Sequence, residues 1–173
     1  MSEVRGDDAQ APWQGGVVLD FTRSELFERT FEEGMELVEE TAAYLDGAGR
    51  QDSKLLSRTG ALAYASESMR LTTRLMQVAS WLLVQRAVRE GDMNPADACE
   101  ERYRLGAHEI SENRAAEGIE ELPNGLLTLL DRSERLYDRI RHLDRRMYVD
   151  QTGEPEPHPL QSQMDRLQAA FGR

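Results

Sequence analysis

Residues 61–91 read ALAYASESMRLTTRLMQVASWLLVQRAVREG, and this stretch decides the fold. Its large apolar side chains recur at spacings of three and four, which places them on one face of a helix. That face comprises Leu71, Leu75, Val78, Ala79 and Leu82. Trp81, Val84 and Val88 fall outside it. We therefore expect one long helix that is apolar on two sides, as in the centre of a bundle or at a contact with a partner.

Three neighbouring segments also carry helical patterns, and together they predict helices at about 22–46, 53–90, 95–105 and 123–148. Thr22 and Glu25 have the spacing of a capping box at the first start. Gly47 suits a left-handed helix end, and Asp52 or Ser53 can cap the next helix. Asn94 and the proline after it have the pattern of a third helix start. These signals place the helical bundle domain at 21–148.

The remaining segments lack regular periodicity. Residues 1–20 are expected to form a disordered N-terminal arm, 107–121 a mobile acidic connection, and 149–173 a flexible C-terminal tail. No strand pattern or internal repeat is present. The predicted fold is therefore all-α, a three-helix bundle.

The composition limits the classes of partner. The chain has 173 residues and a formal charge of −11, which opposes binding to nucleic acid or to an anionic membrane surface. Its longest dense apolar run, VASWLLV, is too short to insert across a membrane. Cys99 is the only cysteine, as suits a reducing cytoplasm, and the N-terminus lacks a signal-peptide pattern. We expect a cytoplasmic protein whose partners are proteins.

The sequence carries few candidates for chemistry. His108, His142 and His158 share no helical spacing, and the Glu-x-x-His motif of di-metal bundles is absent. Cys99 has no neighbouring histidine to activate it. The arginines at 132–146 are interleaved with acids, which favours a solvated face over a DNA-reading helix. We predict no catalytic residue, no cofactor and no bound metal.

A ridge of arginine, glutamine and tryptophan side chains follows the long central helix. It includes Arg70, Arg74, Gln77, Trp81, Gln85 and Val88. Arginine and tryptophan often anchor protein interfaces, so the candidate interface residues are Arg70, Arg74, Trp81, Val84 and Val88. A homodimer through Trp81, Val84 and Val88 is one hypothesis. The other is that Trp81 packs beneath the first long helix while Arg70 and Arg74 pair with its glutamates.

The C-terminal tail ends in a short amphipathic pattern. Leu160, Met164, Leu167 and Phe171 recur at steps of four, three and four after the proline-rich segment GEPEPHP. A peptide of this length is only marginally helical alone, so it either docks on its own bundle or binds another protein. These four residues are the candidate tail contact.

Three stretches resemble the RcdA family, the regulators of CtrA degradation in alphaproteobacteria. They are FEEGMELVEETAAYLDGAGR, ALAYASESMRLTTRLMQVASWLLVQRAVREGDM and LPNGLLTLLDRSERLYDRIRHLD. The run ESMRLTTRLMQVASWLLVQRAV is the most specific of them. The resemblance covers about 19–94 and 122–148.

This resemblance implies a dimerising three-helix bundle that acts as a non-enzymatic adaptor. It would join substrate proteins to the ClpXP protease primed by CpdR, and for CtrA it would work with PopA. Recruitment to a cell pole is left open. An alternative function from another class is a ligand-binding or metal-binding helical bundle.

Overall fold

The computed structural model describes residues 12–105 and 117–148. Within these ranges every regular element is helical. The long helices are α2 (Glu25–Asp46), α4 (Arg58–Glu90) and α6 (Asn124–Tyr148). The short elements are α1 (Pro12–Thr22), α3 (Ala48–Ser53), α5 (Pro95–Ala98) and the 3₁₀ turns η1 (Glu101–Tyr103) and η2 (Ile119–Glu121). The predicted all-α three-helix bundle is confirmed.

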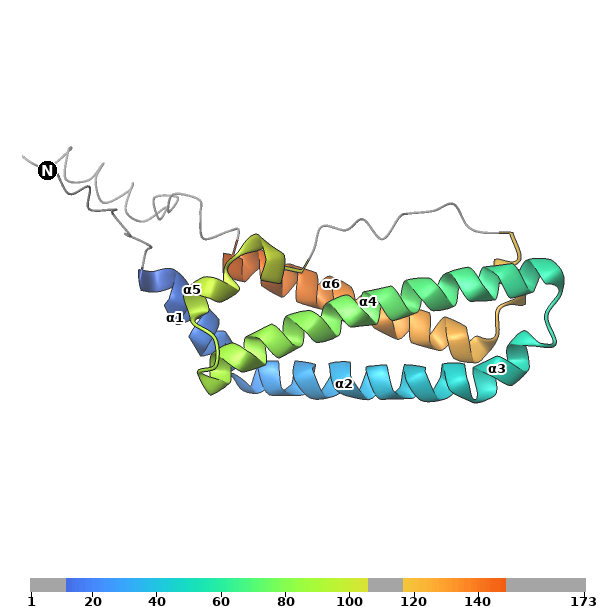
Figure 1. Cartoon of the computed structure of the whole chain (residues 1–173), viewed down its shortest axis with the longest axis horizontal. Helices are drawn as coiled ribbons and strands as arrows, with labels where there is room; N and C mark the ends of the chain where they lie inside the picture. The colour runs from blue at the N-terminus through green and yellow to red at the C-terminus, as the bar shows by residue number, and fades with distance from the viewer. Residues whose placement is uncertain (1–11, 106–116, 149–173) are drawn as a thin grey trace, which may run out of the picture.

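The three long helices do not all run in the same direction. Arg89 near the end of α4 pairs with Glu28 near the start of α2, so these two helices are antiparallel. α4 and α6 are parallel, because early residues of one contact early residues of the other. Arg74 of α4 is hydrogen-bonded to Ser133 of α6. Eleven residues further along α4, Gln85 is hydrogen-bonded to Tyr148, which is fifteen residues further along α6. Between α4 and α6, α5 lies near one end of the bundle and η2 at the other (Figure 1).

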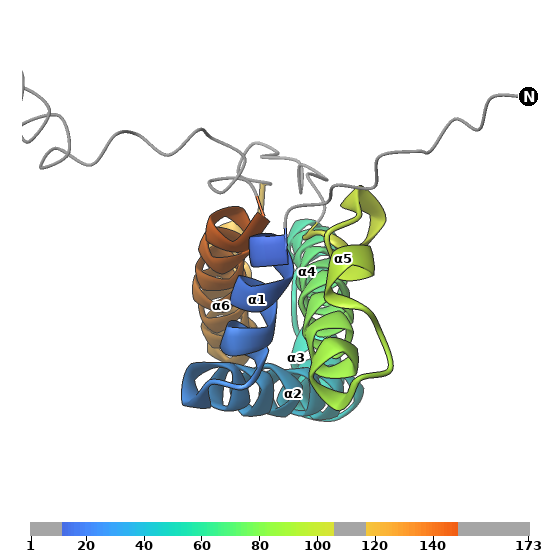
Figure 2. The ribbon, with the colours of Figure 1, turned by 90° about the vertical axis from the view of Figure 1, so that its left-hand side faces the viewer.

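The core lies where α2, α4 and α6 face one another, and the end-on view shows them as the corners of a triangle (Figure 2). Leu71, Val78, Leu82, Leu126, Leu136 and Ile140 are fully buried there. Gly34 of α2 permits close packing, because a Cβ at this position would lie 2.5 Å from Leu82 Cδ1. Four of the five residues predicted on the core face of α4 are buried, and Ala79 is half-buried.

The predicted disordered arm is wrong over residues 12–20, which belong to α1. Residues 1–11 lie outside the described ranges. Val18 is fully buried, and the Phe21 ring packs 5.7 Å from Phe27 and 6.1 Å from Trp81, measured between ring centroids. Burial against the bundle stabilises a segment whose own pattern is weak, since most helical stability in proteins comes from tertiary packing.

Two helix starts lie later than predicted. Ser24, rather than Thr22, caps α2 and accepts a hydrogen bond from the backbone N–H of Phe27 at 3.2 Å. Residues 48–53 form the separate helix α3, and α4 is capped by Ser57 rather than by Asp52 or Ser53. Gly47 has a φ of −109°, so the predicted left-handed end is wrong there. Gly91 provides such an end to α4, with a φ of +81°.

The connection between α4 and α6 differs from the prediction at both of its edges: the helix predicted at 95–105 is shorter, and the part of the acidic connection at 117–121 is structured. Asn94 caps α5 as expected, but this helix ends at Ala98 and is followed by η1. Residues 117–121 are also structured, because η2 docks on the first turn of α4. Both carboxylate oxygens of Glu121 accept hydrogen bonds from Ser57, at 3.1 Å from N and 2.7 Å from Oγ. Residues 106–116 lie outside the described ranges.

Ion pairs connect the acidic helix α2 to its neighbours. Arg132 and Arg139 of α6 pair with Glu40 and Glu33 of α2, and Arg89 of α4 makes the third such link. Each pair is partly exposed, and exposed pairs contribute about 0–1 kcal/mol. These contacts favour one register of the helices, while burial of the apolar core supplies most of the stability.

Candidate functional site

The predicted interface ridge lies largely inside the bundle. Trp81 and Val88 are each 2% exposed and Arg74 is 7% exposed. Arg70 and Val84 are half-buried. A side chain already covered by its own chain offers no surface to a partner, so the predicted interface is wrong for Arg74, Trp81 and Val88. The homodimer itself stays a prediction.

The partners of these side chains explain their burial. Arg74 donates a hydrogen bond to Ser133 Oγ of α6 at 2.8 Å, and Arg70 pairs with Glu67 on its own helix at 3.6 Å. The second hypothesis expected both arginines to pair with glutamates of α2, and neither of them does. Trp81 is buried, as that hypothesis expected. The hypothesis placed it beneath the helix at 22–46, but its ring packs against Phe21 of α1 and its N–H donates to Asp144 of α6.

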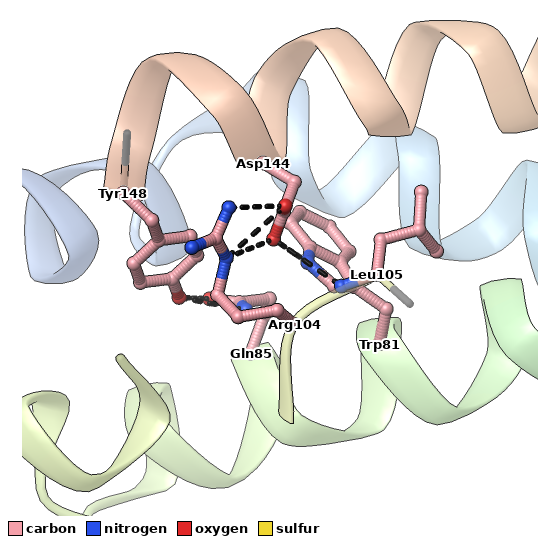
Figure 3. Close-up of polar contacts among 6 residues, drawn as sticks. All are labelled: Trp81, Gln85, Arg104, Leu105, Asp144 and Tyr148. Atoms are coloured by element: carbon pink, nitrogen blue, oxygen red, sulfur yellow. Dashed lines mark hydrogen bonds and ion pairs between the residues drawn. The ribbon is translucent and has the colours of Figure 1, made fainter. Parts of the chain in front are cut away.

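Asp144 is the centre of a buried polar network that joins α4, α6 and the segment after η1 (Figure 3). Trp81 Nε1 donates to Asp144 Oδ1 at 2.9 Å. The guanidinium of Arg104 reaches both carboxylate oxygens, with Nη2 2.7 Å from Oδ2 and Nε 3.0 Å from Oδ1. The backbone N–H of Leu105 donates to the same carboxylate at 3.4 Å. Asp144 is only 3% exposed, so these donors replace the water that it loses.

Tyr148 and Gln85 extend this network to the last residue of α6. The Gln85 amide nitrogen lies 3.0 Å from the Tyr148 hydroxyl, and Arg104 stacks on the Tyr148 ring at 4.8 Å from its centroid (Figure 3). Burial is the largest cause of the raised pKa of Tyr148 and outweighs the opposing hydrogen bond from Gln85. The network therefore holds the end of α6 against α4, and it accounts for the arginine and tryptophan that resembled an interface.

The exposed side of α4 presents a different surface, which we call the α4 outer face. Between residues 62 and 83 it comprises Leu62, Ala65, Ser66, Met69, Thr72, Thr73, Met76, Ser80 and Leu83. None of these residues is charged, although 31% of the chain is. The four large members are 53–71% exposed and recur every seven residues. They form one apolar line along α4, on the side opposite the core residues.

The sequence contained a signal for this face that its arginines and tryptophan obscured. Leu62, Met69, Met76 and Leu83 repeat at heptad spacing, and between residues 62 and 83 no charged residue shares their side of the helix. Such a pattern predicts a second packing surface. Which of the two off-core lines of α4 is covered within the chain depends on the position of α6, for which the sequence of α4 carries no signal.

The other predicted residues are distributed without forming a reactive cluster. His142 is exposed on α6, and Cys99 is half-buried with a pKa raised chiefly by burial. Across residues 12–105 and 117–148, no group of three or more histidine, cysteine and acidic side chains could hold a metal ion. His108, His158 and the tail residues Leu160, Met164, Leu167 and Phe171 lie outside these ranges. None of the described helices combines the length and hydropathy needed to cross a bilayer.

Comparison with known proteins identifies the family. A family described as a protein of unknown function, DUF1465, matches residues 18–171. The chain belongs to the DUF1465 family. The crystal structure of RcdA from Caulobacter crescentus CB15 is 71% identical in sequence, with a TM-score of 0.63. The match covers 76% of this chain and 98% of that one. No curated protein matches the chain. The resemblance to the RcdA family seen in the sequence is thus confirmed for this DUF1465 member.

Proposed function

We propose that the protein is a non-enzymatic adaptor that promotes degradation of cell-cycle and developmental regulators, such as CtrA, by the ClpXP protease. The observation that carries this proposal is the uncharged α4 outer face on a bundle of the RcdA type. An adaptor holds protease and substrate together and so raises their effective concentration, which requires contact surfaces and no covalent chemistry. CpdR-primed ClpXP, substrate proteins and, for CtrA, PopA are the proposed partners.

The proposal includes a homodimer, and the α4 outer face has the symmetry that such a contact needs. In an antiparallel pair of α4 helices centred between Thr72 and Thr73, Leu62 lies opposite Leu83 of the second copy. Met69 likewise lies opposite Met76. A two-fold interface uses the same patch on both copies, so a sequence that reads similarly from either end fits it.

The energetics favour this face over the others for a self-contact. Each copy carries a formal charge of −11, so two copies repel at long range. An uncharged contact adds no local repulsion, and burying a large apolar side chain fully is worth roughly 1.5–3 kcal/mol. The acidic surface of α2 would bring like charges together. We place the dimer on α4, and the contacts with CpdR and the substrates on surfaces that the dimer leaves free.

A charge placed on the α4 outer face tests the proposal. Met76→Glu puts a carboxylate against the apolar Met69 side chain of the second copy, at both symmetry-related points of the proposed dimer, and burying an unpaired charge is costly. We therefore expect light scattering to give a monomer mass at concentrations where the unmodified chain is dimeric. Leu26→Glu is the matched control, because Leu26 is 50% exposed near the start of α2. It should leave the mass unchanged.

A reconstituted degradation time course tests the adaptor function itself. ClpXP and CpdR are incubated with candidate substrates, with and without the full-length chain, and with PopA for CtrA. Faster loss of at least one substrate is expected only when the chain is present. Equal rates with and without the chain for every substrate would overturn the proposed function.

A further inference from the structure

The last described residue lies close to one end of the α4 outer face. Tyr148 is held at Gln85 through its hydroxyl, and Gln85 is two residues along α4 from Leu83 (Figure 3). The 25 residues that follow Tyr148 therefore start within one helical turn of Leu83 along the axis of α4, although on the other side of that helix. Any segment of this tail that can reach around α4 has access to the face.

The tail contains a stretch whose pattern matches that face in length and charge. Leu160, Met164, Leu167 and Phe171 share one side of a helix and would span about 17 Å at 1.5 Å per residue. Only two charged residues, of opposite sign, lie between the first and last of them. The stretch from Leu83 back to Met69 on α4 covers about 21 Å by the same rise. An apolar, electrically neutral helix and an uncharged helix face are compatible surfaces.

The chain between Tyr148 and Leu160 is long enough for this contact. Twelve residue steps at about 3.3 Å span up to about 40 Å. Half of the circumference of a helix with side chains, of diameter about 10–12 Å, is about 16–19 Å. The linker therefore reaches the face with length to spare, and an intramolecular contact needs no rearrangement of the bundle.

We propose that residues 160–171 pack as an amphipathic helix on the α4 outer face of their own chain, over Leu83, Met76 and Met69. This segment then competes with the second copy for the same surface. A short tether gives an effective concentration on the order of 1 mM, so a partner at about 1 µM must bind roughly 1,000-fold more tightly to displace it. The tail would act as a built-in restraint on dimer formation, and in that sense the inference rests on the proposed function.

The test uses disulfide formation in the full-length chain with Cys99 replaced by serine. One variant carries Met76→Cys with Met164→Cys, and the matched control carries Asp138→Cys with Met164→Cys. Asp138 is exposed on α6, and its distance from Tyr148 along the helix is similar to that of Met76 from Gln85. At about 1 µM under mild oxidation, we expect the first variant to form the intramolecular disulfide at least about tenfold faster.

Two further measurements make the result decisive. Adding Leu167→Ser and Phe171→Ser should lower the rate of the Met76 pair to that of the control, because the apolar contact is lost. Leu83→Cys replaces Met76→Cys if circular dichroism shows that the latter variant does not fold. Equal rates of disulfide formation for the α4 and α6 pairs would overturn the inference, as would a rate for the Met76 pair that the serine substitutions leave unchanged.

Failure of this inference can be told apart from failure of the proposed dimer. Met69→Cys with Met76→Cys, in the same background and at increasing protein concentration, reports only on a second copy through covalent dimers, because the two cysteines lie about 10.5 Å apart within one helix but opposite each other across the proposed dimer. Covalent dimers without the intramolecular product would reject the tail contact and keep the dimer. The intramolecular product without covalent dimers, even after the serine substitutions, would reject the dimer and keep the tail contact.

Discussion

Replacing Asp144 with alanine tests whether the buried polar network holds α6 in place. The change removes the acceptor of the Trp81 N–H, and an unsatisfied buried donor costs about 1–3 kcal/mol. It also leaves the Arg104 charge unpaired, and breaking a buried ion pair costs about 3–5 kcal/mol. The Arg104 side chain is 20% exposed and can recover some hydration, so we expect each cost to lie at the lower end of its range. We expect a total loss of about 4 kcal/mol, or about 8–16 °C in Tm for a chain of this size.

Urea titration and thermal unfolding, both followed by far-UV circular dichroism, measure this loss. Asp144→Asn keeps an oxygen for Trp81 but removes the charge that faces Arg104, so we expect an intermediate effect. Asp138→Ala is the control, since this exposed residue of the same helix should change stability by less than about 0.5 kcal/mol. A loss below about 1 kcal/mol for Asp144→Ala would refute the role assigned to the network.

Two other predictions concern packing and thiol chemistry. Gly34→Ala should destabilise the bundle by about 1–3 kcal/mol, because the new Cβ would lie 2.5 Å from the buried Leu82 Cδ1; an unchanged urea midpoint would contradict the close approach of α2 to α4. Burial raises the pKa of Cys99, so the pH midpoint of its alkylation rate should lie above the usual thiol pKa of about 8.5. A pH midpoint at or below that of free cysteine, measured on the folded protein, would show that burial does not control this thiol.

Periodicity was sufficient to predict the three long helices, because their apolar faces are long and regular. The starts were less certain because several residues can act as caps. Thr22 and Ser24 are both good cap residues, and the choice between them depends on α1 occupying the chain up to Thr22. α1 itself was missed because its stability comes from burial of Val18 and its neighbours against helices distant in sequence. The parallel direction of α4 and α6 likewise has no local signal.

The predicted interface residues likewise depend on contacts between residues far apart in the sequence. Arginine and tryptophan on a helix favour either an interface or a buried polar contact, and the sequence around Trp81 does not distinguish them. The deciding partner, Asp144, is 63 residues away. By contrast, the seven-residue repeat of Leu62, Met69, Met76 and Leu83 is local and could have been recognised from the sequence. Its interpretation as an exposed face required knowing that α6 covers the opposite side of α4.

The parallel arrangement of α4 and α6 has a consequence for synthesis on the ribosome. The antiparallel α2 and α4 are joined by a short connection and can pair as soon as both have emerged, since local contacts form early. The inner side of α4, with Arg74, Trp81 and Gln85, finds its partners only after residues 133–148 have been made. The nascent chain therefore keeps part of its apolar core uncovered for some 60 residues of translation, an interval in which chaperones can bind the exposed apolar surface.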